Sequence, residues 1–227
     1  GFENDTYFEM AGRDIRALPK LEGTVHVNIM LIVKFMQNYL FNPKEYEELG
    51  TVNDRTSDDF LWDQGPTKGL GKVQFHDYNI VYDKFDLPNL NIFKEQIKIF
   101  KEMLINATPE KSQGMNPDFT LTVGEMFTLI VYGQLILENA PTHNVDNDII
   151  DQMFDCFVRD FSSFALGLYS KPMTTEAQME YCLKMIKKPA VDEARYQRVW
   201  ENHVFALKDT YTTVSYTHLT LPTEDSV

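Results

Sequence analysis

Glu22 is a carboxylate that the sequence places at a well-defined junction between two helices. We expect one helix to end near Leu18, before a proline, and a new apolar helix to begin near Val25. Gly23 allows a close backbone approach at such a junction, and Thr24 is a favourable helix N-cap. A carboxylate held there could act as a general base, or it could only complement the helix dipole. Residue types alone favour the dipole role.

A glycine-rich stretch further along superficially suggests a phosphate-binding loop. It is DQGPTKGLGKV, which contains Gly65, Gly69, Gly71 and Lys72. A P-loop needs its second glycine where Leu70 stands and a metal-binding hydroxyl where Val73 stands. The stretch is therefore better interpreted as a flexible turn.

Metal chemistry has little support in the sequence. Four aspartates recur closely, namely Asp146, Asp148, Asp151 and Asp155. They fall on the first turns of a predicted helix, where acidic residues complement the dipole, and the glycine and terminal glutamate of a calcium loop are missing. The histidines with candidate positions, His26, His76, His143 and His203, have no partner at metal-ligand spacing. No metal site is predicted.

The two cysteines, Cys156 and Cys182, are predicted to be inert core residues because both lie on apolar helical stripes. A single pair without C-x-x-C spacing forms neither a disulfide scaffold nor a zinc or redox motif. We therefore expect a reducing compartment, either the cytoplasm or, in a eukaryote, the mitochondrial matrix.

Apolar residues at helical spacing dominate the second half of the chain, so the predicted fold class is all-α. One helix carries Phe93, Ile97, Phe100 and Leu104, with Asn89 or Asn91 as its cap and Pro109 beyond its end. A second follows a capping box of Thr122 and Glu125, is apolar on nearly every face to Leu137, and is therefore expected at the centre.

Three more helices follow by the same argument. The longest has a stripe of Ile149, Met153, Phe157, Phe161, Phe164 and Leu168, widened by Ile150, Phe154 and Val158. The next carries Met179, Cys182 and Ile186, and the last carries Tyr196, Val199, Trp200, His203 and Leu207. A short β segment is conceivable only at 73–81. We predict an antiparallel bundle of four or five helices from Asn91 to Lys208.

Composition excludes several classes of partner. The chain has 34 acidic and 21 basic residues among 227, a net charge of -13, which argues against nucleic acid and anionic membrane surfaces. Lys34 interrupts one apolar stretch and Gly133 another, so no run of about 18 apolar residues predicts a transmembrane segment. With 43% hydrophobic residues the chain can bury a core.

Both ends are expected to be artificial boundaries. The sequence starts at Gly1 without an initiator methionine or a targeting segment, which suggests a fragment of a longer protein. Residues 214–223, VSYTHLTLPT, resemble a translated sequencing adapter, so 214–227 are interpreted as an artefactual tail.

The stretch GF(x10)RDIRALPKLEGT resembles the C-terminal helical domain of acyl-CoA dehydrogenases. The matching residues are Gly1, Phe2, Arg13, Asp14, Glu22, Gly23 and Thr24, and the match runs without a gap over 1–41. The resemblance implies that 1–41 end the dehydrogenase helical domain. Residues 42–88 have no long helical stripe and are rich in glycine, proline and aspartate, so we expect them to form an extended connection. Residues 89–213 resemble the additional helical region of the long-chain versions of the family.

The resemblance also implies a function, the FAD-dependent α,β-dehydrogenation of acyl-CoA thioesters in fatty acid β-oxidation. Glu22 inherits the role of catalytic base, Gly23 a contact to the acyl-CoA, and Thr24 and His26 contacts to FAD. The expected electron acceptor is an electron-transfer flavoprotein, and the expected assembly is a homo-oligomer. The chain alone, without the preceding domains, is expected to be inactive.

A second interpretation stays open because much of the chain lies outside the motif. The chain could be a non-catalytic helical dimerisation or docking module of the same fold, with residues 41–213 as its interaction surface.

Overall fold

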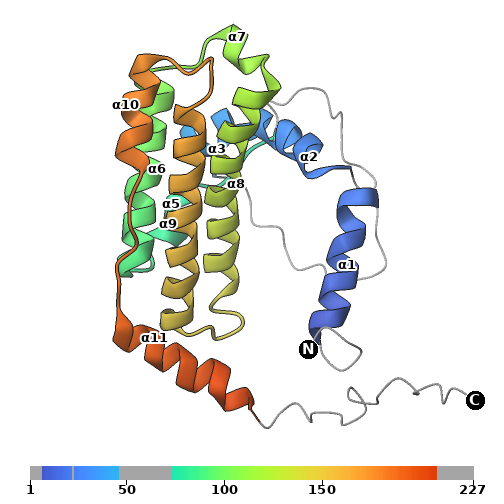
Figure 1. Cartoon of the computed structure of the whole chain (residues 1–227), viewed down its shortest axis with the longest axis vertical. Helices are drawn as coiled ribbons and strands as arrows, with labels where there is room; N and C mark the ends of the chain where they lie inside the picture. The colour runs from blue at the N-terminus through green and yellow to red at the C-terminus, as the bar shows by residue number, and fades with distance from the viewer. Residues whose placement is uncertain (1–6, 22, 46–72, 209–227) are drawn as a thin grey trace, which may run out of the picture. The chain divides into compact units, whose positions relative to one another are not determined.

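The computed structural model describes residues 7–21, 23–45 and 73–208, and these contain helices and no strand (Figure 1). The predicted all-α class is confirmed. The β segment considered at 73–81 is wrong, because the chain there is irregular and then forms the short helix α5 (Asn79–Tyr82).

The described residues fall into two compact units. Residues 23–191 form the first, and residues 7–21 and 192–208 belong to the second. The domain boundaries predicted from the sequence lie near residues 41 and 88 instead.

Four helices build most of the first unit: α6 (Pro88–Asn106), α8 (Pro117–Asn139), α9 (Asn147–Tyr169) and α10 (Glu176–Met185). Helix α9 packs against α6, α8 and α10, and α10 also packs against α6. The successive helices α8, α9 and α10 turn at opposite ends and so run antiparallel, with the short α7 (Lys111–Gly114) near one end (Figure 1). A helical bundle is therefore observed, as predicted.

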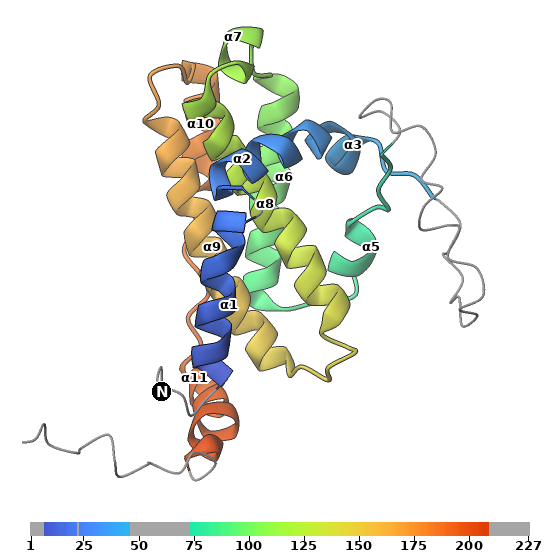
Figure 2. The same cartoon turned by 90° about the vertical axis from the view of Figure 1, so that its right-hand side faces the viewer.

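A second group of elements crosses this bundle. It consists of α2 (Val25–Ile32), the 3₁₀ turn η1 (Val33–Phe35) and α3 (Met36–Phe41), with α2 packed on α8 (Figure 2). Gly124 makes the contact close, since a Cβ there would stand 2.3 Å from Ile29 Cγ2. Residues 25–41 are thus part of the same unit as the bundle.

The predicted extended connection, residues 42–88, ends inside the core. Tyr78, Val81 and Tyr82 are buried, and the Tyr82 hydroxyl donates to the carbonyl of Ile130 at 2.8 Å. Residues 46–72, which include the glycine-rich stretch, lie outside the described residues.

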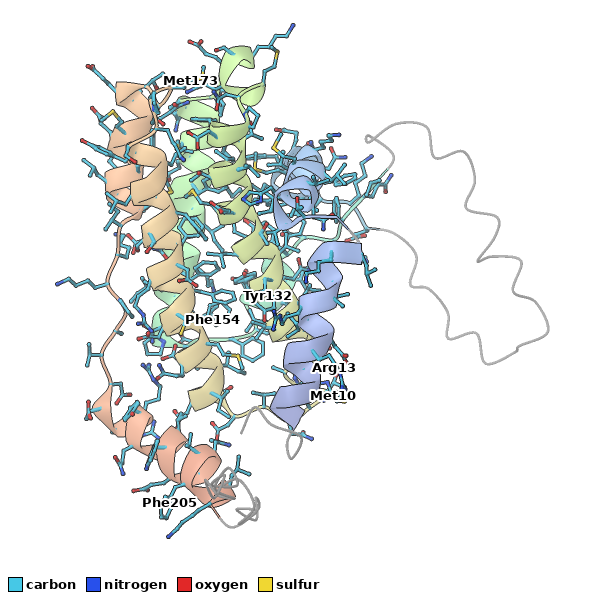
Figure 3. All side chains as sticks on the ribbon, turned by 45° about the vertical axis from the view of Figure 1, so that its right-hand side comes forward. Met10, Arg13, Tyr132, Phe154, Met173 and Phe205 are labelled. Carbon is cyan, nitrogen blue, oxygen red and sulfur yellow. The ribbon has the colours of Figure 1, made fainter. Side chains whose placement is uncertain are left out.

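Aromatic rings fill the centre of the bundle. Phe154, fully buried, contacts Phe93 and Phe157 at ring centroid distances of 5.5 and 5.2 Å (Figure 3). Phe161 is also fully buried and Phe157 is 7% exposed, so the predicted α9 stripe is confirmed at these positions. Met153 departs from it with 40% exposure, because the buried face is centred one residue further along.

The predicted helix caps of α6 and α8 are wrong. Leu87 is the N-cap of α6, and Asn89 is a buried residue inside the first turn. Helix α8 begins at Pro117, where Asn116 Oδ1 accepts from Phe119 N at 3.0 Å. Thr122 is a buried residue within that helix, so it forms no capping box.

The carboxylate of Asp151 caps α6, whereas it was expected to complement the dipole of its own helix, α9. Its Oδ1 accepts the backbone N–H of Asn89 at 2.7 Å, and its Oδ2 accepts from Asn89 Nδ2 at 3.2 Å. Asn89 Oδ1 in turn accepts from Ala190 N at 2.7 Å. This buried carboxylate on α9 therefore caps α6 across the core instead of complementing the dipole of its own helix.

Helix α8 is long and apolar enough to cross a membrane, with mean hydropathy 1.4 over its best window. Half of that window is buried within the protein, where α2, α5 and α9 pack against the helix. A core helix of this kind passes the same test as a membrane span, so its length and composition decide nothing about a membrane.

The second unit contains α1 (Tyr7–Leu21) and a C-terminal helical segment. That segment is α11 (Glu193–Val199), a π-helical turn (Trp200–Val204) and a 3₁₀ turn (Phe205–Leu207). Helix α1 continues past residue 19, where the proline was expected to end it. In the last predicted stripe Tyr196, Trp200 and Leu207 are exposed at 52%, 44% and 46%, whereas Val199 and His203 are partly buried.

Candidate functional site

The predicted site lies where α2 begins. Glu22, the predicted base, lies outside the described residues. Gly23, the next residue, has a φ of +90°, in the left-handed region that glycine adopts without the strain of a Cβ. Thr24 is extended, with φ -68° and ψ 155°, and Thr24 Oγ1 accepts from Val27 N at 3.4 Å. The predicted threonine cap is therefore confirmed. The predicted close approach at Gly23 is not observed, because a Cβ there would lie 3.9 Å from the nearest atoms, and the glycine serves the positive φ instead.

A further contact closes this turn. Asn28 Nδ2 donates to the carbonyl of Gly23 at 3.5 Å, and the backbone N–H of Asn28 donates to the carbonyl of Thr24 at 3.1 Å. The side chains of Thr24 and Asn28 thus fix the backbone on either side of the helix start. This local geometry involves only residues 23–28.

His26 lies on the rim of a shallow apolar hollow of about 350 Å³. Val27, Met30 and Leu31 of α2 and Leu121 of α8 contribute its walls. His26 itself is exposed, as is Leu31 at 49%. The hollow is a surface against which a flat apolar group could lie, but it does not enclose one.

Helix α2 is apolar on more than the face that it buries. Ile29 packs against α8 and is 8% exposed, whereas Val25 and Val27 are 56% and 52% exposed. A short helix with apolar residues all round is usually covered on more than one side. The start of α2 therefore has the character of a bundle helix with one packed and one open face.

The described residues could supply only one side of an FAD-binding site. Thr24 offers a hydroxyl, His26 an imidazole, and the hollow an apolar floor. The other half of the motif, Arg13 and Asp14, lies on α1 in the second unit, with the two side chains 66% and 70% exposed (Figure 3).

The cysteines differ from each other. Cys182 is fully buried, and burial raises the pKa of its thiol to about 11, which confirms its inert character. The same prediction is wrong for Cys156, which is exposed and accepts from Arg159 Nη2 at 3.5 Å. Among the described residues, no three His, Cys, Asp or Glu side chains converge on a point that could hold a metal ion.

One pocket was missed by the sequence analysis, which treated the aromatic residues as core material. Phe35, Tyr39, Phe75 and Phe127 line a cavity of about 440 Å³ in the first unit. Only Phe35 and Tyr39, four residues apart, were detectable as neighbours on one face of a helix. The other two rings come from separate segments, so nothing in the sequence pattern joined them.

Comparisons with protein-family models, with curated proteins and with solved structures find no match to this chain.

Proposed function

We propose that this chain is the C-terminal helical part of an FAD-dependent acyl-CoA dehydrogenase in which Glu22 is the catalytic base. The support is the spacing RD(x7)EGT together with the geometry at its end. The observation that carries the proposal is the φ of +90° at Gly23 directly before the Thr24 cap.

The proposed dehydrogenation needs a carboxylate that acts as a general base. Glu22 would take the α-proton of the acyl-CoA thioester while the β-hydrogen leaves as hydride, so that a C=C bond forms between the two carbons. FAD, when bound, would supply the two-electron oxidation by accepting the hydride, and an electron-transfer flavoprotein would then reoxidise it. The backbone N–H of Glu22 would donate to the thioester carbonyl and stabilise the developing enolate.

The neighbours of Glu22 would have supporting roles. Gly23 would lie against the substrate, where the absence of a side chain permits close approach. Thr24 and His26 would contact the flavin side, with the hollow beside His26 excluding water from one face. Because the described residues form only one edge of such a site, the chain alone would bind no FAD.

A second candidate function rests on a different observation. Within the 41–213 region, the apolar residues Tyr132 and Leu135 on α8 and Leu166 on α9 are exposed. They favour a non-catalytic docking or dimerisation module, which would bury these residues against a second chain. The two functions differ in whether the full-length protein carries a flavin.

The test is the full-length protein, obtained by recovering the coding sequence upstream of Gly1. The dehydrogenase proposal predicts a yellow protein whose flavin absorbance bleaches when an acyl-CoA is added without oxygen. The 227-residue chain should be colourless. A full-length protein without flavin, or one whose flavin no acyl-CoA of short, medium or long chain reduces, would exclude the dehydrogenase and leave the docking module.

A further inference from the structure

The pocket lined by Phe35, Tyr39, Phe75 and Phe127, here called the aromatic pocket, is remote in sequence from the Gly23 turn. It lies within the first unit, between η1 and α3 on one side and α8 on the other. Its volume of about 440 Å³ falls in the range of about 300–1,000 Å³ that is usual for sites that bind small molecules.

The four rings are joined in a chain by three edge-to-face contacts. Phe75 packs edge to face with Phe35 and with Tyr39, at interplanar angles of 69° in both pairs. Tyr39 packs in the same way with Phe127, at 75° and a centroid distance of 5.3 Å. Ring faces carry partial negative charge, so a ring face that is open to the pocket favours a cation over a neutral group of the same shape.

A fixed polar chain runs along the pocket wall. The hydroxyl of Tyr39, a residue only 3% exposed, donates to Gln134 Oε1. Gln134 Nε2 donates to Glu138 Oε1 at 2.7 Å. Glu138 is exposed and also lines the pocket, so it places a carboxylate beside the aromatic walls.

The charges around the pocket favour the same kind of ligand. Among the described residues that line it, none is a lysine or an arginine. The net charge of -13 would also raise the local concentration of cations.

The same aromatic cluster already holds one cation on another side. Tyr39 stacks on Tyr78 with a centroid distance of 5.3 Å and an interplanar angle of 9°. Lys101 Nζ donates to the Tyr78 hydroxyl at 3.2 Å, which leaves it 5.3 Å from the centroid of that ring, and it lies 5.5 Å from the centroid of Phe41. These distances are within the roughly 6 Å range of cation–π contacts, so an ammonium group is accommodated by these rings.

We propose that the aromatic pocket binds an organic ammonium ion, with the cation against Phe35 and Phe75 and its charge balanced by Glu138. The chemical class is a quaternary or alkylated ammonium group on a small apolar body, because the remaining walls offer aliphatic contacts. This binding is independent of the proposed dehydrogenase activity, which involves residues 22–26.

A neutral apolar molecule is the competing occupant, and a matched pair of probes separates the two. Choline carries the quaternary nitrogen. Its neutral counterpart, 3,3-dimethyl-1-butanol (here called dimethylbutanol), has a carbon atom in place of that nitrogen and nearly the same shape. Each is titrated into the 227-residue chain by isothermal calorimetry. We expect choline to bind at least about tenfold more tightly than dimethylbutanol, since only the cation gains from the ring faces and the carboxylate.

Two variants locate the site. Phe75→Leu keeps an apolar wall but removes a ring, and Glu138→Gln removes the charge at an exposed position. Each should weaken choline binding about threefold to tenfold and leave dimethylbutanol unchanged. Glu180→Gln, an exposed position on α10 that does not line the pocket, makes the same charge change as a control and should have no effect.

Several results would overturn the proposal. They are equal affinity for the two probes, no detectable choline binding at millimolar concentration, and choline binding that survives Glu138→Gln unchanged in a chain with native circular dichroism.

Discussion

Gln113 and Gln178 hydrogen-bond to each other through both of their side-chain amides. Gln113 Nε2 lies 2.7 Å from Gln178 Oε1, and Gln178 Nε2 lies 3.1 Å from Gln113 Oε1. Each glutamine also completes a capping box, with Oε1 accepting from Glu110 N at 2.8 Å and from Thr175 N at 3.0 Å respectively. One buried pair thus joins the starts of α7 and α10.

Replacing Gln178 by Leu should therefore destabilise the protein strongly. The change leaves the Gln113 amide, the Thr175 N–H and the Ala107 carbonyl without their buried partner. Unsatisfied buried groups cost about 1–3 kcal/mol each, so we expect a loss of roughly 2–4 kcal/mol in urea unfolding. Gln37→Leu, at an exposed position on α3, should stay within about 0.5 kcal/mol of the parent, and equal effects of the two changes would contradict the pair's role.

The docking of α2 on α8 depends on Gly124. A Cβ in Gly124→Ala would meet Ile29 Cγ2 at 2.3 Å, so we expect a loss of roughly 1–3 kcal/mol in the free energy of unfolding. Adding Ile29→Ala removes the clashing atom, and the double variant should lose less than the sum of the single changes. Gly114→Ala, where nothing lies within 4 Å, is the control. Additive losses at Gly124 and Ile29 would show that the two residues do not meet.

The two thiols should react at very different rates. Iodoacetamide needs a thiolate, and burial both raises the pKa of Cys182 to about 11 and blocks access to its sulfur. Mass spectrometry of the native protein at pH 8 should find Cys156 alkylated and Cys182 unmodified, and both modified in urea. Equal labelling of Cys182 in the native protein would mean that α10 is not packed as described.

Alkaline pH should destabilise the fold through buried tyrosines. Burial raises the pKa of Tyr78 to about 12, with a further increase from Asp77, and raises the pKa of Tyr39 and Tyr82 well above the ordinary value. Because the folded protein favours their neutral form, the stability from these groups is complete below about pH 10, the unfolded pKa. It is lost as the pH rises from there through the folded pKa values.

Ultraviolet titration of tyrosinate absorbance measures this directly. Of the 11 tyrosines, at least these three should remain neutral at pH 11 in the folded protein. Tyr78→Phe should reduce the loss of unfolding free energy between pH 9 and pH 12 relative to the parent. A parent whose tyrosines all titrate together near pH 10 while it stays folded would refute the buried cluster.

Helical periodicity predicted the main bundle because burial there follows the chain. The steps from Phe93 to Leu104 and from Phe157 to Leu168 mark faces that are buried in α6 and α9. Such spacing requires no knowledge of the partner helix.

The caps, the α5 region and the aromatic pocket could not be predicted in this way. The α6 start is capped by Asp151, a residue 62 positions away, and not by a local asparagine. Tyr78 and Tyr82 were interpreted as part of a connection because their core partners are distant in sequence: Tyr78 stacks on Tyr39, and Tyr82 contacts Phe93, Ile130 and Phe154. At the candidate site the cap at Thr24 was predicted correctly, since a threonine cap is a local feature, whereas the positive φ of Gly23 was not anticipated.

The role of Glu22 is tested most directly by stopped-flow reduction of the flavin in the full-length protein, before and after Glu22→Gln. The account predicts that acyl-CoA still binds and the melting temperature is retained while flavin bleaching slows by about 10²- to 10⁴-fold, because the base is gone. Glu45→Gln, at an exposed position beyond α3, should bleach at the parent rate. Unchanged bleaching after Glu22→Gln, with a stability loss of only about 0.3–1 kcal/mol, would instead show a carboxylate that merely complements the α2 dipole and would contradict the account.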